Sequence, residues 1–259
     1  MPKGFLIDQD GVIYVENKMI PGADVFIKTL QDNDIPFTFM TNNSQRTPLD
    51  AVKKLEKMGI YVKPENVYTS AMATAHFMAQ QFPGGTAYVL GEGGLISSLH
   101  DNGISLVQNE PDFVVVGEGI NFTLEMVRHA IDFILEGSKF IATNLDPSPR
   151  KKGWNNLGIA SIVAMIEAAT GKKAFSVGKP SPVMMRQARK YIGLATDEAT
   201  VIGDTLGTDI QGGVQVGYKT ILTLSGMSSR DQLNDFPFKP DLVINSIADL
   251  TLDRLPWWD

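Results

Sequence analysis

The chain has 259 residues, and its 43% hydrophobic and 20% charged residues are typical of a folded globular protein, which excludes wholesale disorder. Its 23 basic and 29 acidic residues give a net charge of -6, which argues against a dedicated nucleic-acid binder and does not favour a membrane surface. The absence of cysteine excludes disulfide scaffolds, thiolate zinc sites, iron–sulfur clusters and a thiol nucleophile.

The first residues do not have the pattern of a targeting signal. The apolar run Phe5–Ile7 is followed at once by Asp8 and Asp10, so no apolar segment of signal-peptide length develops. The longest uncharged apolar-rich stretch, 157–166, is far shorter than the roughly 18 residues that a membrane helix needs. We therefore expect a cytoplasmic protein without a membrane partner.

Short apolar runs alternate with helical patterns along the chain. Thr47 and Pro48 mark the start of one helix and Gly59 its end, and Ser181–Pro182 and Gly193 do the same for a later one. The apolar runs do not alternate with polar residues, as expected of parallel strands that are buried on both faces. Repeated β-then-α order predicts an α/β fold with a mostly parallel sheet. The runs lie at residues 5–7, 37–40, 87–90, 113–116, 140–142, 175–177, 200–202, 220–224 and 242–244.

Two turn-forming segments, Phe82–Gly85 and Gly171–Lys173, suggest a subdivision of the chain. The stretch between them contains three strand-like runs and three helical patterns, which is enough for a small domain inserted into a larger one. We therefore expect a core made of residues 1–81 and 175–259, with an inserted domain at 82–174.

The first two strands end in polar side chains that can carry chemistry. Asp8 and Asp10 are two residues apart on an extended chain, so they point to the same side, and like charges this close resist joint ionisation unless a cation intervenes. One can then remain a carboxylate while the other holds a proton, although a simple Asp-Gly turn is the alternative. The second strand runs into Thr41, Asn42 and Asn43, whose hydroxyl, amide and main-chain N–H groups can hold an anion or form only a turn.

Two later strands end in charged residues. Lys179 lies between a glycine and a proline just before a helix, where it can meet a phosphate. Asp204 and Asp209 follow another strand, and carboxylates that converge from separate strands suit Mg²⁺, although Asp204 can also simply cap a helix. Because ligands of parallel α/β sheets bind at the carboxyl ends of the strands, these ends are where a site is expected.

In this order, the residues resemble the motifs of the haloacid dehalogenase superfamily of phosphatases. Asp8–Gly11 resembles motif one, Thr41 motif two, Lys179 motif three and Gly203–Asp209 motif four. The long stretch between Thr41 and Lys179 is similar to the subclass in which a large cap is inserted between motifs two and three. The details resemble the NagD-type branch, in particular Thr41-Asn42-Asn43, Thr69-Ser70-Ala71, Thr143-Asn144-Leu145-Asp146 and Gly178-Lys179-Pro180.

The resemblance implies a Rossmann-like, doubly wound parallel sheet core with an inserted smaller α/β cap domain. It also implies an Mg²⁺-dependent phosphatase that works through an aspartyl-phosphate. Asp8 is then the nucleophile and Asp10 the general acid and base. Mg²⁺ is held by Asp8, the main-chain carbonyl of Asp10 and Asp204, and Asp209 supports these ligands.

The resemblance further assigns substrate-binding roles. Thr41, Asn42 and Asn43 bind the phosphoryl group, and Lys179 neutralises negative charge on both Asp8 and the phosphate.

Specificity is expected from the cap. Asn144 and Asp146 are candidates to contact the leaving group, as are Trp154 and its neighbours Asn155 and Asn156. We expect small phosphorylated metabolites, nucleoside monophosphates first, with sugar phosphates as the alternative. The pairing of two copies of the chain remains open.

The sequence also argues against two rival functions. Gly91–Gly94 and Gly117–Gly119 follow strands and begin like a dinucleotide-binding fingerprint, but Ile96 and Phe122 occupy the positions of the third glycine, so the fingerprint fails. A non-catalytic phosphate-binding protein is the other alternative. It is disfavoured because the nucleophile, the acid and base, the lysine and the metal aspartate are all present.

Overall fold

The chain folds into two compact units. The core unit comprises Met1–Thr41, Pro48–Tyr68 and Lys179–Asp259, and the inserted unit comprises Asn42–Thr47 and Thr69–Gly178. The computed structural model describes residues 3–147 and 158–257. The segment Asn42–Thr47 belongs to the inserted unit although both of its neighbours in sequence belong to the core.

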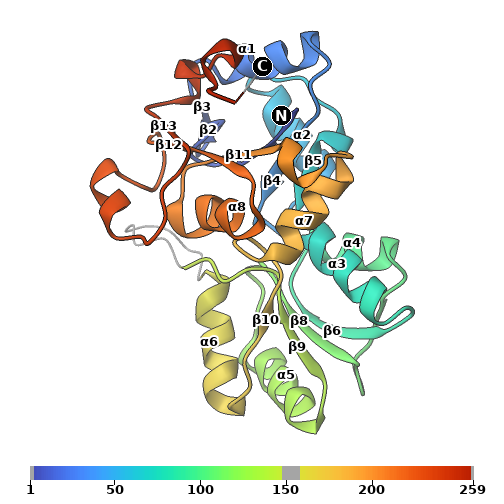
Figure 1. Ribbon diagram of the computed structural model, residues 1–259. Coiled ribbons are helices and arrows are strands. Elements are labelled where there is room, and N and C mark those ends of the chain that lie inside the picture. Colours follow the sequence, from blue (N-terminus) through green and yellow to red (C-terminus); the bar gives the residue numbers. More distant parts are fainter. Residues whose placement is uncertain (1–2, 148–157, 258–259) are drawn as a thin grey trace. The chain divides into compact units, whose positions relative to one another are not determined.

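The core unit is built on a six-stranded sheet in the order β13-β12-β11-β1-β4-β5 (Figure 1). The pairs from β13 through β4 are all parallel. Every residue of β1 and β11 is buried, which explains why their sequences are apolar without alternation. The strands are β1 (Gly4–Ile7), β4 (Phe37–Thr41), β5 (Val67–Thr69), β11 (Ala199–Gly203), β12 (Lys219–Thr223) and β13 (Leu242–Ile244).

Within its described residues, the core unit also contains four α-helices. Phe26, Ile27 and Leu30 of the first helix are buried in the same hydrophobic cluster as Phe5 and Ile7 of β1. The helices are α1 (Ala23–Asp32), α2 (Pro48–Glu56), α7 (Pro182–Tyr191) and α8 (Gln211–Val216), with a π-helical turn at Leu206–Ile210. A short antiparallel hairpin is formed by β2 (Tyr14–Val15) and β3 (Lys18–Met19), and 3₁₀ turns lie at Pro64–Asn66, Thr196–Glu198, Arg230–Asn234, Ile247–Asp249 and Leu252–Arg254.

The inserted unit has its own five-stranded parallel sheet in the order β10-β9-β8-β6-β7. Alternate residues of its central strands pack with α5 and α6 into one hydrophobic cluster, whereas α3 contacts α4. The strands are β6 (Thr86–Leu90), β7 (Ser105–Leu106), β8 (Phe113–Val116), β9 (Lys139–Ala142) and β10 (Phe175–Ser176). The helices are α3 (Ser70–Gln81), α4 (Gly94–Asp101), α5 (Leu124–Glu136) and α6 (Ile159–Thr170).

The predicted fold class, a parallel α/β core with an inserted smaller α/β unit, is confirmed. The limits of the inserted unit differ from the expected 82 and 174. It already includes α3, because this helix packs against α4, and it extends to Gly178, because Phe175 pairs with Ile141 across β10 and β9. The turn at Phe82–Gly85 therefore separates two elements of one unit.

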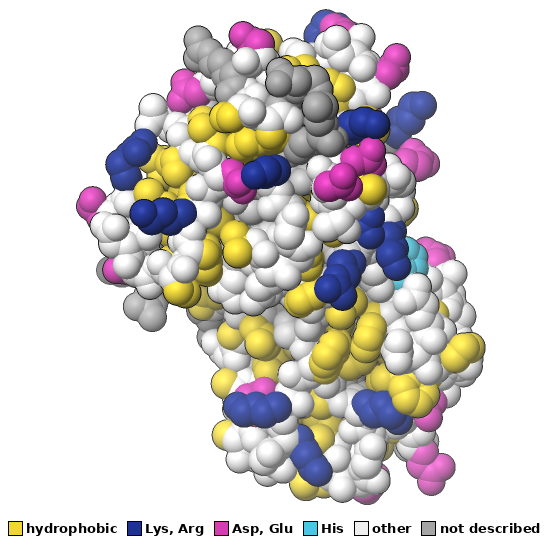
Figure 2. All heavy atoms as spheres, in the orientation of Figure 1, with side chains coloured by type: hydrophobic (Ala, Val, Ile, Leu, Met, Phe, Trp, Pro, Cys, Tyr) yellow, Lys and Arg dark blue, Asp and Glu magenta, His cyan; other side chains and the backbone are white. Residues whose placement is uncertain are grey.

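Figure 2 shows Lys and Arg side chains in small groups that are separated by polar and apolar side chains. On this face, the described part of the chain carries no continuous basic stripe of the kind that nucleic-acid binders use. Among the helices of residues 3–147 and 158–257, none is long and apolar enough to cross a membrane.

Candidate active site

Asp8 directly follows the buried strand β1 in the core unit. Its main-chain N–H donates to the carbonyl of Ile202 at 2.8 Å, so the chain stays in sheet geometry up to this residue. Gly11 then adopts φ +79°, a left-handed conformation that glycine tolerates best, and the chain turns into the β2–β3 hairpin. The side chain of Asp8 is buried, whereas Asp10 is exposed.

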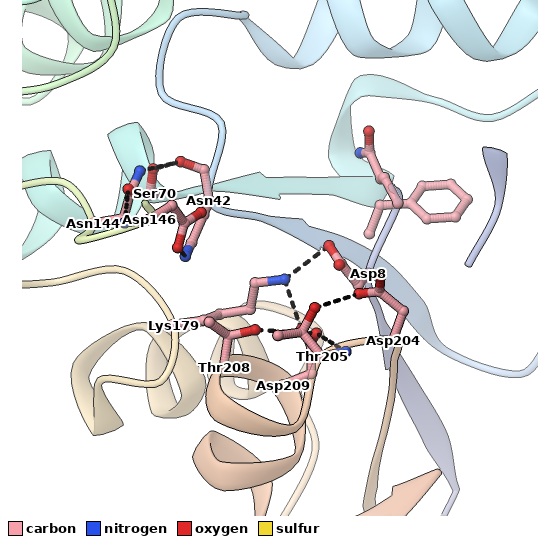
Figure 3. A network of polar contacts seen from close by, with 12 residues as sticks. Asp8, Asn42, Ser70, Asn144, Asp146, Lys179, Asp204, Thr205, Thr208 and Asp209 are labelled. Carbon is pink, nitrogen blue, oxygen red and sulfur yellow. Dashed lines mark hydrogen bonds and ion pairs between the residues drawn. The ribbon is translucent and has the colours of Figure 1, made fainter. Parts of the chain in front are cut away.

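Lys179 forms a buried bridge between two carboxylates of the core unit. Its Nζ lies 2.8 Å from Oδ1 of Asp8 and 2.7 Å from Oδ1 of Asp209 (Figure 3). Charge-assisted hydrogen bonds of this kind are the strongest that side chains form, and a lysine this buried needs them. Of these three residues only Asp8 directly follows a strand of the core sheet, because the strand before Lys179, β10, belongs to the inserted sheet and Asp209 lies in the π-helical turn. The expectation that Lys179 ends a strand beside Asp8 is therefore wrong in its reason, although the two side chains do meet.

Asp204 follows β11 and is held on both carboxylate oxygens. Its Oδ1 accepts from Thr205 Oγ1 at 2.9 Å, and its Oδ2 accepts from the main-chain N–H of Met227 at 2.7 Å. Two glycines make room for it, because a Cβ on Gly11 would lie 2.2 Å from Oδ2 and a Cβ on Gly226 would lie 1.9 Å from it. Only glycine fits at these two positions without movement of the carboxylate.

The carboxylates of Asp8, Asp204 and Asp209 form a group that fits a divalent cation. Each offers one oxygen, and these oxygens lie within 4.8 Å of one another. Carboxylate oxygens are the ligands that Mg²⁺ prefers. A divalent cation would balance the negative charge that these three carboxylates carry when ionised beside Lys179. The carboxylate of Asp10 is not part of this group of three.

The pKa values of these groups reflect burial and mutual charge. Burial raises the pKa of Asp8 well above its usual range, and the charge of Lys179 opposes this. Burial, followed by the charge of Asp209, raises the pKa of Asp204 to about 6. Burial lowers the pKa of Lys179, but the charges of Asp209 and Asp8 outweigh burial, so the net shift is upward. Lys179 therefore stays protonated and supplies a fixed positive charge.

A second group of predicted residues lies together in the inserted unit. The side-chain amide of Asn42 donates to Oδ1 of Asp146 at 3.0 Å. The main-chain carbonyl of Asn42 accepts from Nδ2 of Asn144 at 2.8 Å and from Oγ of Ser70 at 2.5 Å (Figure 3). Asp146 is oriented in turn by its main-chain N–H, which donates to Asn144 Oδ1 at 2.9 Å.

Two family models match separate parts of the chain. Residues 5–105 match the model described as haloacid dehalogenase-like hydrolase, and residues 176–250 match a second model described as HAD-hydrolase-like. The chain belongs to the haloacid dehalogenase-like hydrolases.

Curated relatives of this hydrolase span nearly its whole length. A dihydroxyacetone phosphatase of Corynebacterium glutamicum is 44% identical over 95% of this chain and 90% of its own. The ribonucleotide monophosphatase NagD of Escherichia coli is 38% identical over 96% of this chain and 98% of its own. An acid sugar phosphatase of Staphylococcus epidermidis is 37% identical over 92% of both chains. The solved structure of E. coli NagD superposes with a TM-score of 0.92 over 97% of this chain and 99% of that one. The hydrolase is thus a phosphatase of the NagD type.

The predicted site residues of this phosphatase divide between the units. The core unit holds Asp8, Asp10, Thr41, Lys179, Asp204 and Asp209, and the inserted unit holds Asn42, Asn43, Asn144 and Asp146. Asn43 Oδ1 accepts from the main-chain N–H of Arg46 at 2.9 Å, which is the turn weighed as the alternative for this segment. Trp154, Asn155 and Asn156 lie outside the described residues.

Sequence reasoning missed the loop after β12. Ser225 Oγ donates to the carbonyl of Gly11 at 2.7 Å, and Met227 binds Asp204 through its N–H. This loop therefore fixes both the turn after Asp10 and one carboxylate of the acidic group. A signal was available, because Ser225 and Gly226 directly follow another apolar strand run.

Proposed function

We propose that this phosphatase is an Mg²⁺-dependent phosphomonoesterase that forms an aspartyl-phosphate on Asp8. The observation that carries the proposal is the buried Lys179 bridge between Asp8 and Asp209, beside Asp204. A carboxylate nucleophile needs a neighbouring positive charge when it attacks an anionic phosphate. Lys179 supplies one such charge, and a divalent cation on the three carboxylates supplies the other when bound.

The reaction balances in two steps. A carboxylate oxygen of Asp8 forms a bond to phosphorus while the bond between phosphorus and the ester oxygen breaks, and Asp10 gives its proton to the leaving alcohol. Asp10 then takes a proton from water, whose oxygen attacks phosphorus and releases inorganic phosphate from Asp8. The exposed position of Asp10 supports this role, because its proton must be exchanged with the leaving group and with water.

Further residues complete the proposed binding set. Thr41, Asn42 and Asn43 bind the phosphoryl oxygens. Asn144 and Asp146, in the inserted unit, contact the leaving group of the bound ester. The amide and carboxylate of these two residues suit hydroxyl groups, which the leaving groups of nucleotides and sugars both carry.

For the leaving group we propose nucleoside monophosphates first. The relative NagD of Escherichia coli, a ribonucleotide monophosphatase, supports this choice. Sugar and triose phosphates are the second candidate, because the 44% identical relative is a dihydroxyacetone phosphatase and another relative is an acid sugar phosphatase.

A substrate panel tests both parts of the proposal. Wild type is assayed with Mg²⁺ on an aryl phosphate, nucleoside monophosphates, hexose phosphates and dihydroxyacetone phosphate. The highest kcat/KM is expected with a nucleoside monophosphate. A higher value with a sugar or triose phosphate replaces the first candidate with the second. If none of the phosphomonoesters in the panel is hydrolysed, the proposed activity itself is contradicted.

Asp146→Ala tests the role of the inserted unit. We expect its activity on the aryl phosphate to stay within about tenfold of wild type, while the ranking of natural esters changes. Asp132→Ala is the matched control, because Asp132 lies in the same unit and pairs with Arg128 on the surface. An equal loss on every substrate for Asp146→Ala, with Asp132→Ala unchanged, contradicts leaving-group recognition by Asp146.

A further inference from the structure

Two Gly-Glu-Gly turns follow adjacent strands of the inserted sheet, and both bind the segment Asn42–Thr47. Gly91–Gly93 follows β6 and Gly117–Gly119 follows β8, and these strands pair in parallel. They are the two motifs that fail as dinucleotide fingerprints. Their contacts give them another role, because each presents a glutamate to the same six-residue segment.

Glu118 holds this segment through its main chain. Its Oε2 accepts from the main-chain N–H groups of Ser44 at 2.6 Å and of Gln45 at 3.4 Å. Its own N–H donates back to Ser44 Oγ at 2.9 Å, and the same hydroxyl accepts from Thr143 Oγ1 at 3.2 Å. Bonds to main-chain atoms fix the path of the segment itself, whichever side chains it carries.

Glu92 contacts the segment differently. Its Oε2 accepts only from the side-chain amide of Gln45 at 2.9 Å, and its Oε1 accepts from the main-chain N–H groups of Ile120 and Asn121. Glu92 thus binds mainly the loop at Ile120 and Asn121. It provides a matched comparison for Glu118, being the same residue type at the end of the neighbouring strand.

The segment runs closely against the backbone of the same unit. The main-chain N–H of Gly94 donates to the carbonyl of Gln45 at 2.7 Å. A Cβ on Gly93 would lie 2.2 Å from that carbonyl oxygen, and a Cβ on Gly94 would lie 2.4 Å from the carbonyl oxygen of Arg46. Glycine at positions 93 and 94 therefore allows the segment Asn42–Thr47 to lie close to this backbone, and the hydrogen bonds of Glu118 hold the segment there.

We propose that Glu118 is a positioning residue for phosphoryl binding. The segment that it holds begins with Asn42 and Asn43 and continues directly from Thr41 at the end of β4. The inference rests on the proposed function, in which these three residues bind the phosphoryl group. Glu118 acts through the Ser44 and Gln45 N–H groups and does not touch the substrate. Its effect concerns the phosphoryl group, which all phosphomonoesters share.

The test compares Glu118→Ala, Glu118→Gln and the matched control Glu92→Gln. The inhibition constant of inorganic phosphate is measured against aryl phosphate hydrolysis, and phosphate binding is measured by calorimetry with Mg²⁺ present. For Glu118→Ala, both constants and KM should rise by about tenfold or more, since two bonds to a carboxylate are lost. Glu118→Gln keeps one acceptor oxygen and should show a smaller rise, and Glu92→Gln should stay within about twofold of wild type.

The ranking of substrates should be the same in Glu118→Ala and in wild type. The proposal is overturned if folded Glu118→Ala has inhibition and binding constants for inorganic phosphate within about twofold of wild type. It is also overturned if the ranking of substrates changes while phosphate binding does not. If Glu118→Ala does not fold, equal constants for Glu118→Gln, Glu92→Gln and wild type overturn it. The two proposals can fail separately. If Asp8→Asn is inactive but the Glu118 variants keep the phosphate inhibition constant, phosphate affinity and KM of wild type, only this inference is rejected. If Asp8→Asn is active, the proposed function is rejected.

Discussion

Nζ of Lys179 lies 2.8 Å from Oδ1 of Asp8, and both side chains are buried. Burial alone disfavours ionisation of either group, so each depends on the other for its charge. This dependence makes the pair both a structural element of the core unit and the basis of the proposed nucleophile.

Replacement of Lys179 should therefore affect stability and activity together. In Lys179→Met, three clustered carboxylates lose their buried cation, and removal of one partner from a buried pair costs about 3–5 kcal/mol. We expect a loss of this order in the free energy of unfolding, measured by urea denaturation in the presence of a chelator, and no detectable phosphatase activity. Lys28→Met is the control, because the exposed Lys28–Asp32 pair contributes less than about 1 kcal/mol. Equal stability of the two variants contradicts the account.

Gly11→Ala should disturb the acidic group through sterics. Alanine at φ +79° is strained, and its Cβ would also lie 2.2 Å from Asp204 Oδ2. Gly59→Ala separates the two effects, since Gly59 has φ +85° and nothing lies within 4 Å of its Cβ position. Gly59→Ala should cost about 1–2 kcal/mol with unchanged Mg²⁺ affinity, whereas Gly11→Ala should cost more and bind Mg²⁺ more weakly. The same Mg²⁺ affinity in both variants, measured by calorimetry, contradicts this prediction.

Mg²⁺ should stabilise the wild type by binding the native carboxylate group. At a hundredfold excess over Kd, the expected stabilisation is about 2.7 kcal/mol, seen as a higher Tm. Asp204→Asn should lose this rise in Tm, and the exposed control Asp32→Asn should keep it.

Turnover should depend on the metal as well. Exhaustive chelation should abolish turnover, Mg²⁺ should restore it, and Ca²⁺ should inhibit because its looser coordination disturbs the attack. Full activity after chelation contradicts a metal requirement.

Glu118 should make stability depend on pH. Burial raises the pKa of Glu118 from 4.5 to about 7; the N–H groups of Ser44 and Gln45 lower it, the charge of Asp146 raises it and that of Arg46 lowers it. Between pH 4.5 and pH 7 the native state binds more protons at Glu118 than the unfolded state does. The stability that protonated Glu118 contributes is therefore fully present below about pH 4.5 and is lost as the pH rises through 7. The stability of wild type relative to Glu118→Gln should fall by about 2–3 kcal/mol from pH 5 to pH 8. A constant difference, or one that grows with pH, opposes this prediction.

Most of the fold could be predicted from the sequence because buried parallel strands leave an uninterrupted apolar signature. The runs at 5–7, 113–116 and 200–202 all lie within the observed strands. The unit boundaries could not be read in the same way. The helix Ser70–Gln81 has the same local pattern in either unit, and only its tertiary contact with α4 assigns it to the inserted one.

The candidate site shows the same division between local and tertiary information. The proximity of Asp8 and Asp204 followed from one rule, that strand ends of a parallel sheet share an edge, because β1 and β11 are paired neighbours. The position of Lys179 did not follow from this rule, because the strand before it, β10, belongs to the inserted sheet. The hydrogen bond from Asn42 to Asp146 could not be predicted from any local pattern, because it joins side chains that are 104 residues apart in the sequence. The position of Gly226 just after a strand run marks its loop in the sequence, but the carboxylate packed against this glycine is a tertiary contact that no local pattern specifies.

The central claim, that Asp8 carries the phosphoryl group during turnover, can be tested by acid quenching. Wild type and Asp10→Asn are mixed with an aryl phosphate and Mg²⁺, quenched within the first turnover and digested, and the peptide containing Asp8 is identified by mass. The account predicts one added phosphoryl group on Asp8, accumulating in Asp10→Asn because activation of water is slowed by about 10²–10⁴-fold, and none in Asp8→Asn. Turnover by Asp8→Asn within tenfold of wild type, or a phosphorylated peptide that lacks Asp8, would contradict it.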